Sequence, residues 1–178
     1  MIRKNIVLIG FMGSGKSSIG RLVARVLGYR YVDIDRLIIE QAGMEIQEIF
    51  ALHGEEHFRE LETGVLETLQ ARGGCVIATG GGVILRARNR ELLQALGWVV
   101  CLSASEDVIF ERVSRNGKRP LLQTENPRET VHNLLESRRP FYAEVAQITV
   151  DTSRLSHEQV VEEILAHPEI KSSCPPLL

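Results

Sequence analysis

The sequence predicts an α/β domain built on a parallel sheet that helices cover on both faces. The first observation is a set of short, nearly uninterrupted apolar runs, which are typical of strands buried on both faces. They lie at 5–10, 29–34, 75–80, 98–103 and 147–151. The second is that stretches with helical apolar spacing alternate with these runs, which favours crossover connections in one sheet. The expected helices cover 15–27, 35–42, 46–52, 56–72, 87–96, 105–114, 127–144 and 156–166.

The composition is that of an ordinary soluble protein. The chain has 178 residues, 44% of them hydrophobic, and a formal net charge of −2. This length fits one domain with a sizeable core. The nearly balanced charge argues against nucleic acid or a membrane surface as a partner, and no apolar run is long enough to span a bilayer. The start MIRKNIVLIG is interpreted as a core strand rather than a signal peptide, because it leads directly into a glycine-rich loop.

The loop after the first expected strand reads GFMGSGKS, at 10–17. Its glycines allow a tight turn that points successive N–H groups into one concave space. A helix that begins near Gly15 adds its N-terminal amides and its dipole. Lys16 contributes a positive charge, and Ser17 offers a hydroxyl to Mg²⁺. The pattern is that of a phosphate-binding loop, or P-loop, and it predicts a polyphosphate ligand.

Acidic side chains lie at the end of the second strand, in the sequence YVDID. Asp33 and Asp35 are two residues apart, so in a strand both would point from one face toward the loop. A P-loop enzyme needs a carboxylate near its Mg²⁺, and the strand ends in CVIATGGG and WVVCLSAS carry none. One aspartate can approach Mg²⁺ directly or through water, while the other meets a substrate hydroxyl. Capping of the next helix is the alternative interpretation.

A mainly helical block, at 35–72, is inserted between the second and third strands. Within it, FRELE places Arg59 and Glu62 on one helix face, where a surface ion pair is the alternative to a binding role. His53 and His57 are four residues apart, but a glycine follows the first histidine where the zinc-protease pattern requires glutamate. We therefore interpret the two histidines as exposed polar residues.

Two further segments can contact a small polar ligand. The third strand ends in Gly80, Gly81 and Gly82, whose bare backbone suits close approach of a ligand, although a simple turn is the alternative. ESRRPFY places Arg138 and Arg139 just before a proline. An arginine can hold a carboxylate through two parallel hydrogen bonds.

Residues 115–127 are polar and contain glycine and proline, so this segment can form a lid. Lys118 and Arg119 in it could close over phosphates or simply remain solvated. Cys75 and Cys101 lie in strand-like runs and are expected to be buried thiols, whereas Cys174 lies in the tail, residues 168–178, which we expect to be loosely ordered. The lack of a disulfide framework suits a reducing cytoplasm.

Taken in chain order, these motifs resemble shikimate kinase. The matching stretches run from residue 6 to about residue 165: GFMGSGKSSIG, DID, IF with HGEEHFRELE, TGGG, RPLL and RRPFYAEVA. The resemblance implies a P-loop NTPase with a nucleoside-monophosphate-kinase-like fold, whose five-stranded parallel sheet has the order 2-3-1-4-5. It also implies a single kinase domain over 1–167, with a substrate-binding insertion at about 35–72 and a lid at about 115–127.

The resemblance further implies a role for each site residue. Asp35 would meet the attacking hydroxyl of shikimate, Lys16 would cradle phosphate, and Arg119 would enter with the lid over the transferring phosphoryl group. Glu62 would orient Arg59. ATP would be bound by Gly13, Ser14, Gly15, Lys16, Ser17, Ser18, Arg112, Arg119 and Arg154. Shikimate would be bound by Asp35, Arg59, Gly80, Gly81, Gly82 and Arg138, and Mg²⁺ by Ser17 with Asp33 through water.

The implied reaction is phosphorylation of the 3-hydroxyl of shikimate by ATP, a step in aromatic amino acid (chorismate) biosynthesis. A kinase for another small hydroxy acid or for a nucleoside monophosphate is one alternative, and the DID, FR and RRP segments speak against it. A nucleotide-binding switch without a small substrate is the other, and the sequence contains no Asn-Lys-x-Asp guanine signature. We expect a cytoplasmic monomer that binds neither nucleic acid nor membranes.

Overall fold

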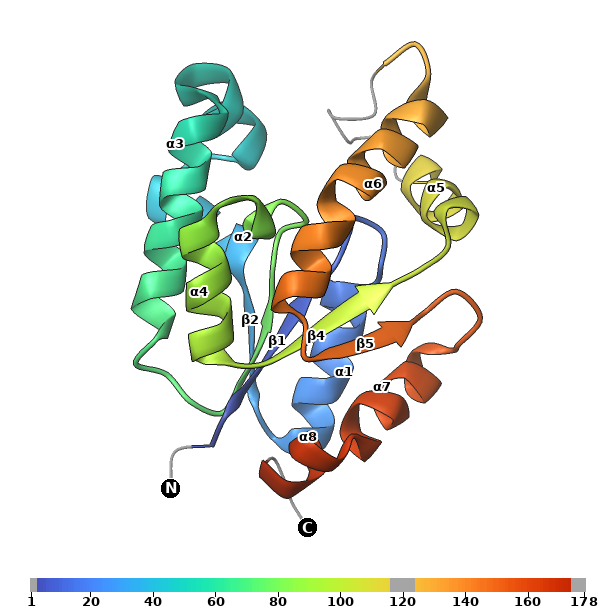
Figure 1. Ribbon diagram of the computed structural model, residues 1–178. Coiled ribbons are helices and arrows are strands. Elements are labelled where there is room, and N and C mark those ends of the chain that lie inside the picture. The colour runs from blue at the N-terminus through green and yellow to red at the C-terminus, as the bar shows by residue number, and fades with distance from the viewer. Residues whose placement is uncertain (1–2, 116–123, 174–178) are drawn as a thin grey trace.

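A five-stranded parallel sheet forms the centre of the computed structural model, which describes residues 3–115 and 124–173 (Figure 1). The strands are β1 (Asn5–Ile9), β2 (Arg30–Asp33), β3 (Cys75–Ala78), β4 (Gly97–Ser103) and β5 (Ile148–Asp151). Their spatial order is β2-β3-β1-β4-β5, and all of these pairings are parallel. The predicted α/β fold and strand order are therefore confirmed.

Helices cover both faces of this sheet. They are α1 (Lys16–Leu27), α2 (Ile34–Ala42), α3 (Ile46–Leu69), α4 (Ala87–Leu96), α5 (Glu106–Ser114), α6 (Pro127–Val145), α7 (His157–Ala166) and α8 (Pro168–Ser173), with a 3₁₀ turn, η1 (Val83–Leu85). Successive residues of a strand point to opposite faces. Val7 and Ile9 accordingly pack with residues of α3, α4 and α6, whereas Ile6 and Leu8 pack with residues of α1, α7 and α8.

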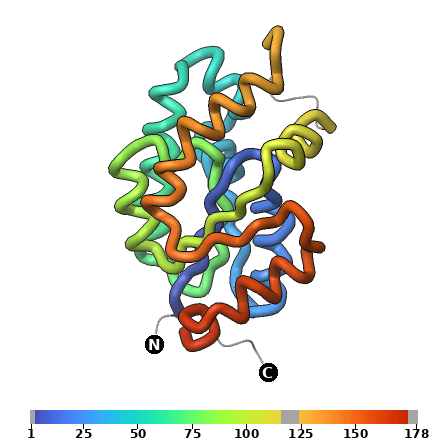
Figure 2. The backbone as a smooth tube through the Cα atoms, turned by 45° about the vertical axis from the view of Figure 1, so that its right-hand side comes forward, coloured from blue at the N-terminus to red at the C-terminus, as the bar shows by residue number. Residues whose placement is uncertain are grey.

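The helix α3 is bent within the predicted insertion. Gly54 has φ 80° and ψ 173°, a conformation that residues other than glycine rarely adopt. The two helices expected at 46–52 and 56–72 are thus two parts of α3 that meet near this glycine. Both α3 and α6 extend past the carboxyl ends of the strands (Figures 1 and 2). Their upper parts stand beyond the sheet edge where the P-loop lies.

The expectation of a loosely ordered tail over 168–178 is wrong for its first part. Residues Pro168–Ser173 form α8, because Ile170 is fully buried in the cluster around α7. The Trp98 Nε1–H also donates a hydrogen bond of 2.8 Å to Ser173 Oγ. The rest of the tail, with Cys174, lies outside the described residues, as does most of the predicted lid, including Lys118 and Arg119.

Cys75 and Cys101 are free and buried, as predicted. Burial raises the pKa of the Cys101 thiol to about 11, so this side chain is a neutral thiol at physiological pH. In the part of the chain that the structure describes, no helix combines the length and the apolar character needed to cross a membrane.

Candidate active site

The P-loop lies between β1 and α1, at the carboxyl end of the central strand. Gly10, Gly13 and Gly15 have φ angles of 139°, 80° and 97°, which only glycine adopts readily. The loop also approaches β4 closely, since a Cβ on Gly10 would lie 2.3 Å from the carbonyl oxygen of Leu102. The loop is therefore folded tightly in front of the N-terminus of α1, an arrangement suited to an anion.

Lys16 lies inside the curve of this loop and is 8% exposed. Its Nζ donates hydrogen bonds to the carbonyl oxygens of Gly10, at 2.7 Å, and Phe11, at 2.8 Å. Ser14 Oγ lies 3.5 Å from the same ammonium group, and Ser18 is exposed on the first turn of α1. A positive charge is thereby fixed beside the amides that could contact a phosphate.

Ser17 and Asp33 face each other across the start of α1 and the end of β2. Ser17 Oγ lies 3.5 Å from Asp33 Oδ2, and the same carboxylate oxygen accepts a hydrogen bond of 2.9 Å from the Tyr31 hydroxyl. Burial raises the pKa of Tyr31 to about 12, so the hydroxyl is protonated and available as a donor. A hydroxyl and a carboxylate beside a phosphate-binding loop fit Mg²⁺, which prefers oxygen ligands. The contact from Tyr31 was not predicted.

Asp35 does not share a strand face with Asp33. The strand β2 ends at Asp33 and α2 begins at Ile34, so Asp35 lies in the first helical turn. The expectation that both carboxylates point from one strand face is therefore wrong, because the chain turns into a helix one residue earlier than the pattern indicates. Asp35 instead faces the end of β3: a Cβ on Gly80 would lie 3.1 Å from its Oδ1.

Arg59 is held between two carboxylates of its own helix. Its Nη1 donates to Glu62 Oε2 at 3.1 Å, and its Nη2 donates to Glu55 Oε1 at 2.9 Å. The Glu62 side chain is fully buried, whereas the Glu55 side chain is 60% exposed. Burial raises the pKa of Glu62 to about 7, against the opposing effect of the neighbouring guanidinium. Glu55 was not predicted, although its position four residues before Arg59 is a signal that the sequence contains.

The glycines after β3 form the floor on which these side chains meet. A Cβ on Gly80 would lie 3.1 Å from Glu62 Oε1, and a Cβ on Gly82 would lie 2.5 Å from Arg59 Nη2. A Cβ on Gly81 would lie 3.3 Å from the backbone nitrogen of Met12, next to the P-loop. Bare backbone at these positions therefore leaves room for the charged groups, which favours the binding interpretation over a simple turn.

Arg138 reaches the same floor from α6. This residue is 6% exposed, and its Nη1 lies 3.4 Å from the Gly81 carbonyl oxygen. The Tyr142 hydroxyl, one turn further along α6, donates to that same oxygen at 2.6 Å. Arg139, by contrast, is exposed and pairs with Glu136 at 2.7 Å. Of the two adjacent arginines, only Arg138 enters the site.

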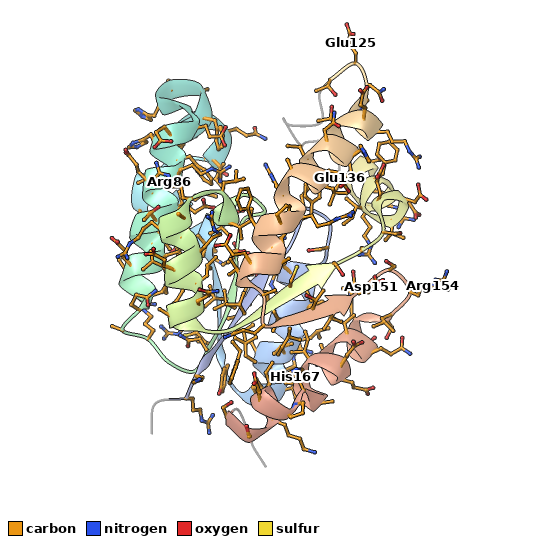
Figure 3. The ribbon with its side chains drawn as sticks, in the orientation of Figure 1. Arg86, Glu125, Glu136, Asp151, Arg154 and His167 are labelled. Atoms are coloured by element: carbon orange, nitrogen blue, oxygen red, sulfur yellow. The ribbon has the colours of Figure 1, made fainter. Side chains whose placement is uncertain are left out.

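Arg112, in the last turn of α5, is directed toward the P-loop. Its Nη1 lies 3.3 Å from the Gly13 carbonyl oxygen, and its Nη2 donates to the Thr152 carbonyl oxygen at 2.8 Å. A pocket of about 430 Å³ opens beside them, with Gly13, Gly15, Ile19, Arg112, Thr152 and Leu155 in its lining. Arg154 is exposed on the loop after β5 and does not line this pocket (Figure 3). Arg119 lies outside the described residues.

Comparisons with known proteins agree on one family. The family model described as "Shikimate kinase" matches residues 12–169. The curated shikimate kinase of Thermodesulfovibrio yellowstonii is 49% identical over 166 residues, which cover 93% of this chain and 95% of the relative. That of Geobacter sulfurreducens is 48% identical over 161 residues, covering 90% and 88%. A solved shikimate kinase from Acinetobacter baumannii, in complex with shikimate, matches with a TM-score of 0.87 and 42% identity, covering 92% and 91%.

Proposed function

This chain belongs to the shikimate kinase family, and we propose on that premise that it transfers the γ-phosphoryl group of ATP to the 3-hydroxyl of shikimate. It is thus an ATP-dependent phosphotransferase of the shikimate pathway. The observation that carries the proposal is the meeting of Arg59, Arg138 and Asp35 at the glycines after β3, beside the P-loop. Two arginines and a carboxylate suit an acceptor that has one carboxylate and several hydroxyl groups.

On the shikimate side, we assign the carboxylate to Arg59 and Arg138. Both arginines are buried residues, so a paired anion would gain strongly from their charge. Asp35 would accept a hydrogen bond from the attacking hydroxyl and receive its proton late in the transfer. Gly80, Gly81 and Gly82 would let the ring approach the backbone closely.

On the ATP side, we assign the phosphates to Lys16 and to the loop residues Gly13, Ser14, Gly15, Ser17 and Ser18. Phosphoryl transfer depends mainly on positioning and on positive charge, because the charge of the transition state is spread over the phosphoryl oxygens. The fixed ammonium of Lys16 supplies such charge within the loop. Arg112, beside the pocket of about 430 Å³, is proposed to contact the nucleotide. The contact of Arg154 with ATP and that of Arg119 with the transferring phosphoryl group stay predictions.

Ser17 and Asp33 are the residues proposed to hold Mg²⁺, with Asp33 acting through water. Bound there, the ion would supply positive charge that helps to neutralise the phosphates of ATP. We further propose that residues 1–167 act as one kinase domain, with the substrate-binding insertion at 35–72 and the lid at 115–127. The free thiols at Cys75 and Cys101 support a reducing compartment, so the proposed location is the cytoplasm, where the protein would act as a monomer.

A coupled ADP-release assay tests the proposed reaction. ADP formation should require shikimate and should be negligible with another small hydroxy acid or with a nucleoside monophosphate as the acceptor. The methyl ester of shikimate, which keeps the ring hydroxyls but has no carboxylate charge, should be a much poorer acceptor. Equal ADP formation with and without shikimate would instead favour the nucleotide-binding switch.

A further inference from the structure

The strand β2 brings a tyrosine to the carboxylate that we assign to Mg²⁺. Tyr31 and Asp33 are two residues apart in β2, so their side chains leave the same face of the sheet. The Tyr31 hydroxyl donates to Asp33 Oδ2 at 2.9 Å, and Ser17 Oγ lies 3.5 Å from that oxygen. Three oxygen-bearing side chains therefore meet where β2 ends and α1 begins.

The ring of Tyr31 is confined by the surface of α1. A Cβ on Gly20 would lie 2.8 Å from Cε2 of this ring, closer than van der Waals contact permits. The absence of a side chain at Gly20 is thus what allows the ring to lie against the helix. Arg21 places its guanidinium carbon 5.2 Å from the ring centroid. The hydroxyl is consequently directed at Asp33 with little freedom to move away.

The hydrogen bond matters because the helix does not orient Asp33. Asp33 is the N-cap residue of α2, yet its side chain makes no capping hydrogen bond. An N-cap aspartate normally accepts from the amides of the first helical turn, which would turn the carboxylate toward its own helix. The contacts from Tyr31 and Ser17 hold it toward α1 and the P-loop instead.

We propose that Tyr31 is a positioning residue of the Mg²⁺ site, whose hydroxyl holds the Asp33 carboxylate in the orientation that the ion or its bound water requires. This inference rests on the proposed function, which assigns Asp33 and Ser17 to Mg²⁺. The alternative is that the tyrosine only fills the space beside Gly20. A phenylalanine would fill the same space, so the two roles can be separated by experiment.

The test is Tyr31→Phe, read out by binding and not only by turnover. ADP affinity is measured calorimetrically over a Mg²⁺ titration, and Mn²⁺ binding to the ADP complex is measured by electron paramagnetic resonance. The Mg²⁺ concentration for half-maximal tightening of ADP should rise about three- to tenfold, as expected for the loss of one partly solvated hydrogen bond. ADP affinity in EDTA should be unchanged. Tyr29→Phe, which removes a hydroxyl two residues earlier, is the matched control. It should show the same Mg²⁺ dependence as the unmodified protein.

Asp33→Asn separates the inference from its premise. If it raises the Mg²⁺ requirement while Tyr31→Phe behaves like Tyr29→Phe, the role of Tyr31 is overturned and the metal site stands. If Asp33→Asn leaves the Mg²⁺ dependence unchanged, the metal assignment itself is wrong. Once Asp33 is replaced, adding Tyr31→Phe should cause no further loss of Mg²⁺ affinity. Additive losses would show that Tyr31 acts by a route other than Asp33 and would overturn the inference.

Discussion

Arg59 has two glutamate partners that differ in what they can do for a ligand. Glu62 is fully buried on the inner side of the guanidinium, and Glu55 is largely exposed on the outer side. A buried partner fixes the arginine, whereas an exposed partner occupies donors that an incoming carboxylate would need. The two glutamates are therefore expected to affect shikimate binding in opposite directions.

Glu55→Gln should lower the KM for shikimate. Glu55 Oε1 accepts from both Nε and Nη2 of Arg59, at 3.3 and 2.9 Å, and these form one edge of the planar donor group. Neutralising the competitor should lower KM by about two- to fivefold, in line with the modest strength of exposed ion pairs. Steady-state kinetics at saturating ATP measures this. A higher KM would mean that Glu55 supports the bound orientation of Arg59 instead of competing with the substrate.

Glu62 should make shikimate binding depend on pH near neutrality. Its pKa is raised to about 7, so it gains a proton as the pH falls below that value and then holds Arg59 less firmly. The KM for shikimate should therefore rise below about pH 7, and Glu62→Gln should have a high KM that no longer changes over this range.

The effect of pH on stability should have the opposite direction. Because the pKa of Glu62 is higher in the folded protein than in the unfolded chain, Glu62 favours folding at low pH, and this contribution is lost as the pH rises toward 7. Parallel KM and urea-unfolding profiles from pH 5.5 to 8.5 would test both signs.

Arg138→Lys should damage shikimate binding far more than Arg139→Lys. An ammonium group cannot reproduce the planar two-bond contact of a guanidinium with a carboxylate. One charge-assisted hydrogen bond contributes about 1.5–3 kcal/mol, so kcat/KM for shikimate should fall roughly ten- to a hundredfold. Arg139 is the adjacent residue but is exposed and paired with Glu136, so its variant is the control. In Arg138→Lys the penalty for shikimate methyl ester should shrink, and an unchanged penalty would remove Arg138 from the carboxylate site.

The sequence predicts some of these residues better than others. Residues that act together within one short segment are predictable, whereas those that depend on an element boundary or on a distant segment are not. The P-loop is predictable because its glycines, lysine and serine act within one short segment. The shared strand face of Asp33 and Asp35 was predicted wrongly, because a strand-to-helix junction can shift by one residue without changing the DID pattern. Tyr142 could not be found from sequence, since its hydrogen bond to Gly81 joins segments 61 residues apart.

At the scale of elements, the bend in α3 links the outer part of the insertion to the site. The bend at Gly54 is immediately followed by Glu55, and one turn later by Arg59. The sequence indicates the break, because a glycine interrupts two helical patterns. It does not give the positive φ, which depends on how the first part of α3 packs. The two glycines of this helix consequently have different roles.

Gly54→Ala and Gly64→Ala should change stability in opposite directions. Gly54 has φ 80° and ψ 173°, where a side chain costs about 1–3 kcal/mol. Gly64 lies in the regular part of the same helix with no heavy atom within 4 Å of an added Cβ, so alanine there should stabilise by about 0.5–1 kcal/mol. Urea unfolding measures both. Gly54→Ala should also raise the KM for shikimate, whereas equal stability of the two variants would mean that the bend carries no strain.

At the scale of the whole molecule, the site and α8 occupy opposite ends of the sheet. The P-loop and the glycines after β3 follow the carboxyl ends of their strands, while α8 packs near the amino ends (Figure 1). The sheet order could be predicted through the family resemblance, but α8 could not. Its short segment contains one apolar anchor, Ile170, whose burial depends on a surface formed by α7 and distant strands.

Ile170→Ala should therefore lower stability without changing catalysis. Ile170 is fully buried in its apolar cluster, with 0% of the residue exposed to solvent. Truncating such a side chain to alanine lowers the free energy of unfolding by about 2–5 kcal/mol, depending on how well the cavity closes. Ser172→Ala, on the exposed side of α8, is the matched control and should unfold at the urea concentration of the unmodified protein. Because α8 lies at the opposite end of the sheet from the P-loop and from the glycines after β3, kcat and both KM values should stay unchanged at a temperature where the variant is folded. A fall in kcat under those conditions would show that the packing of α8 reaches the site through the sheet, and stability and turnover would then not be separable in this fold.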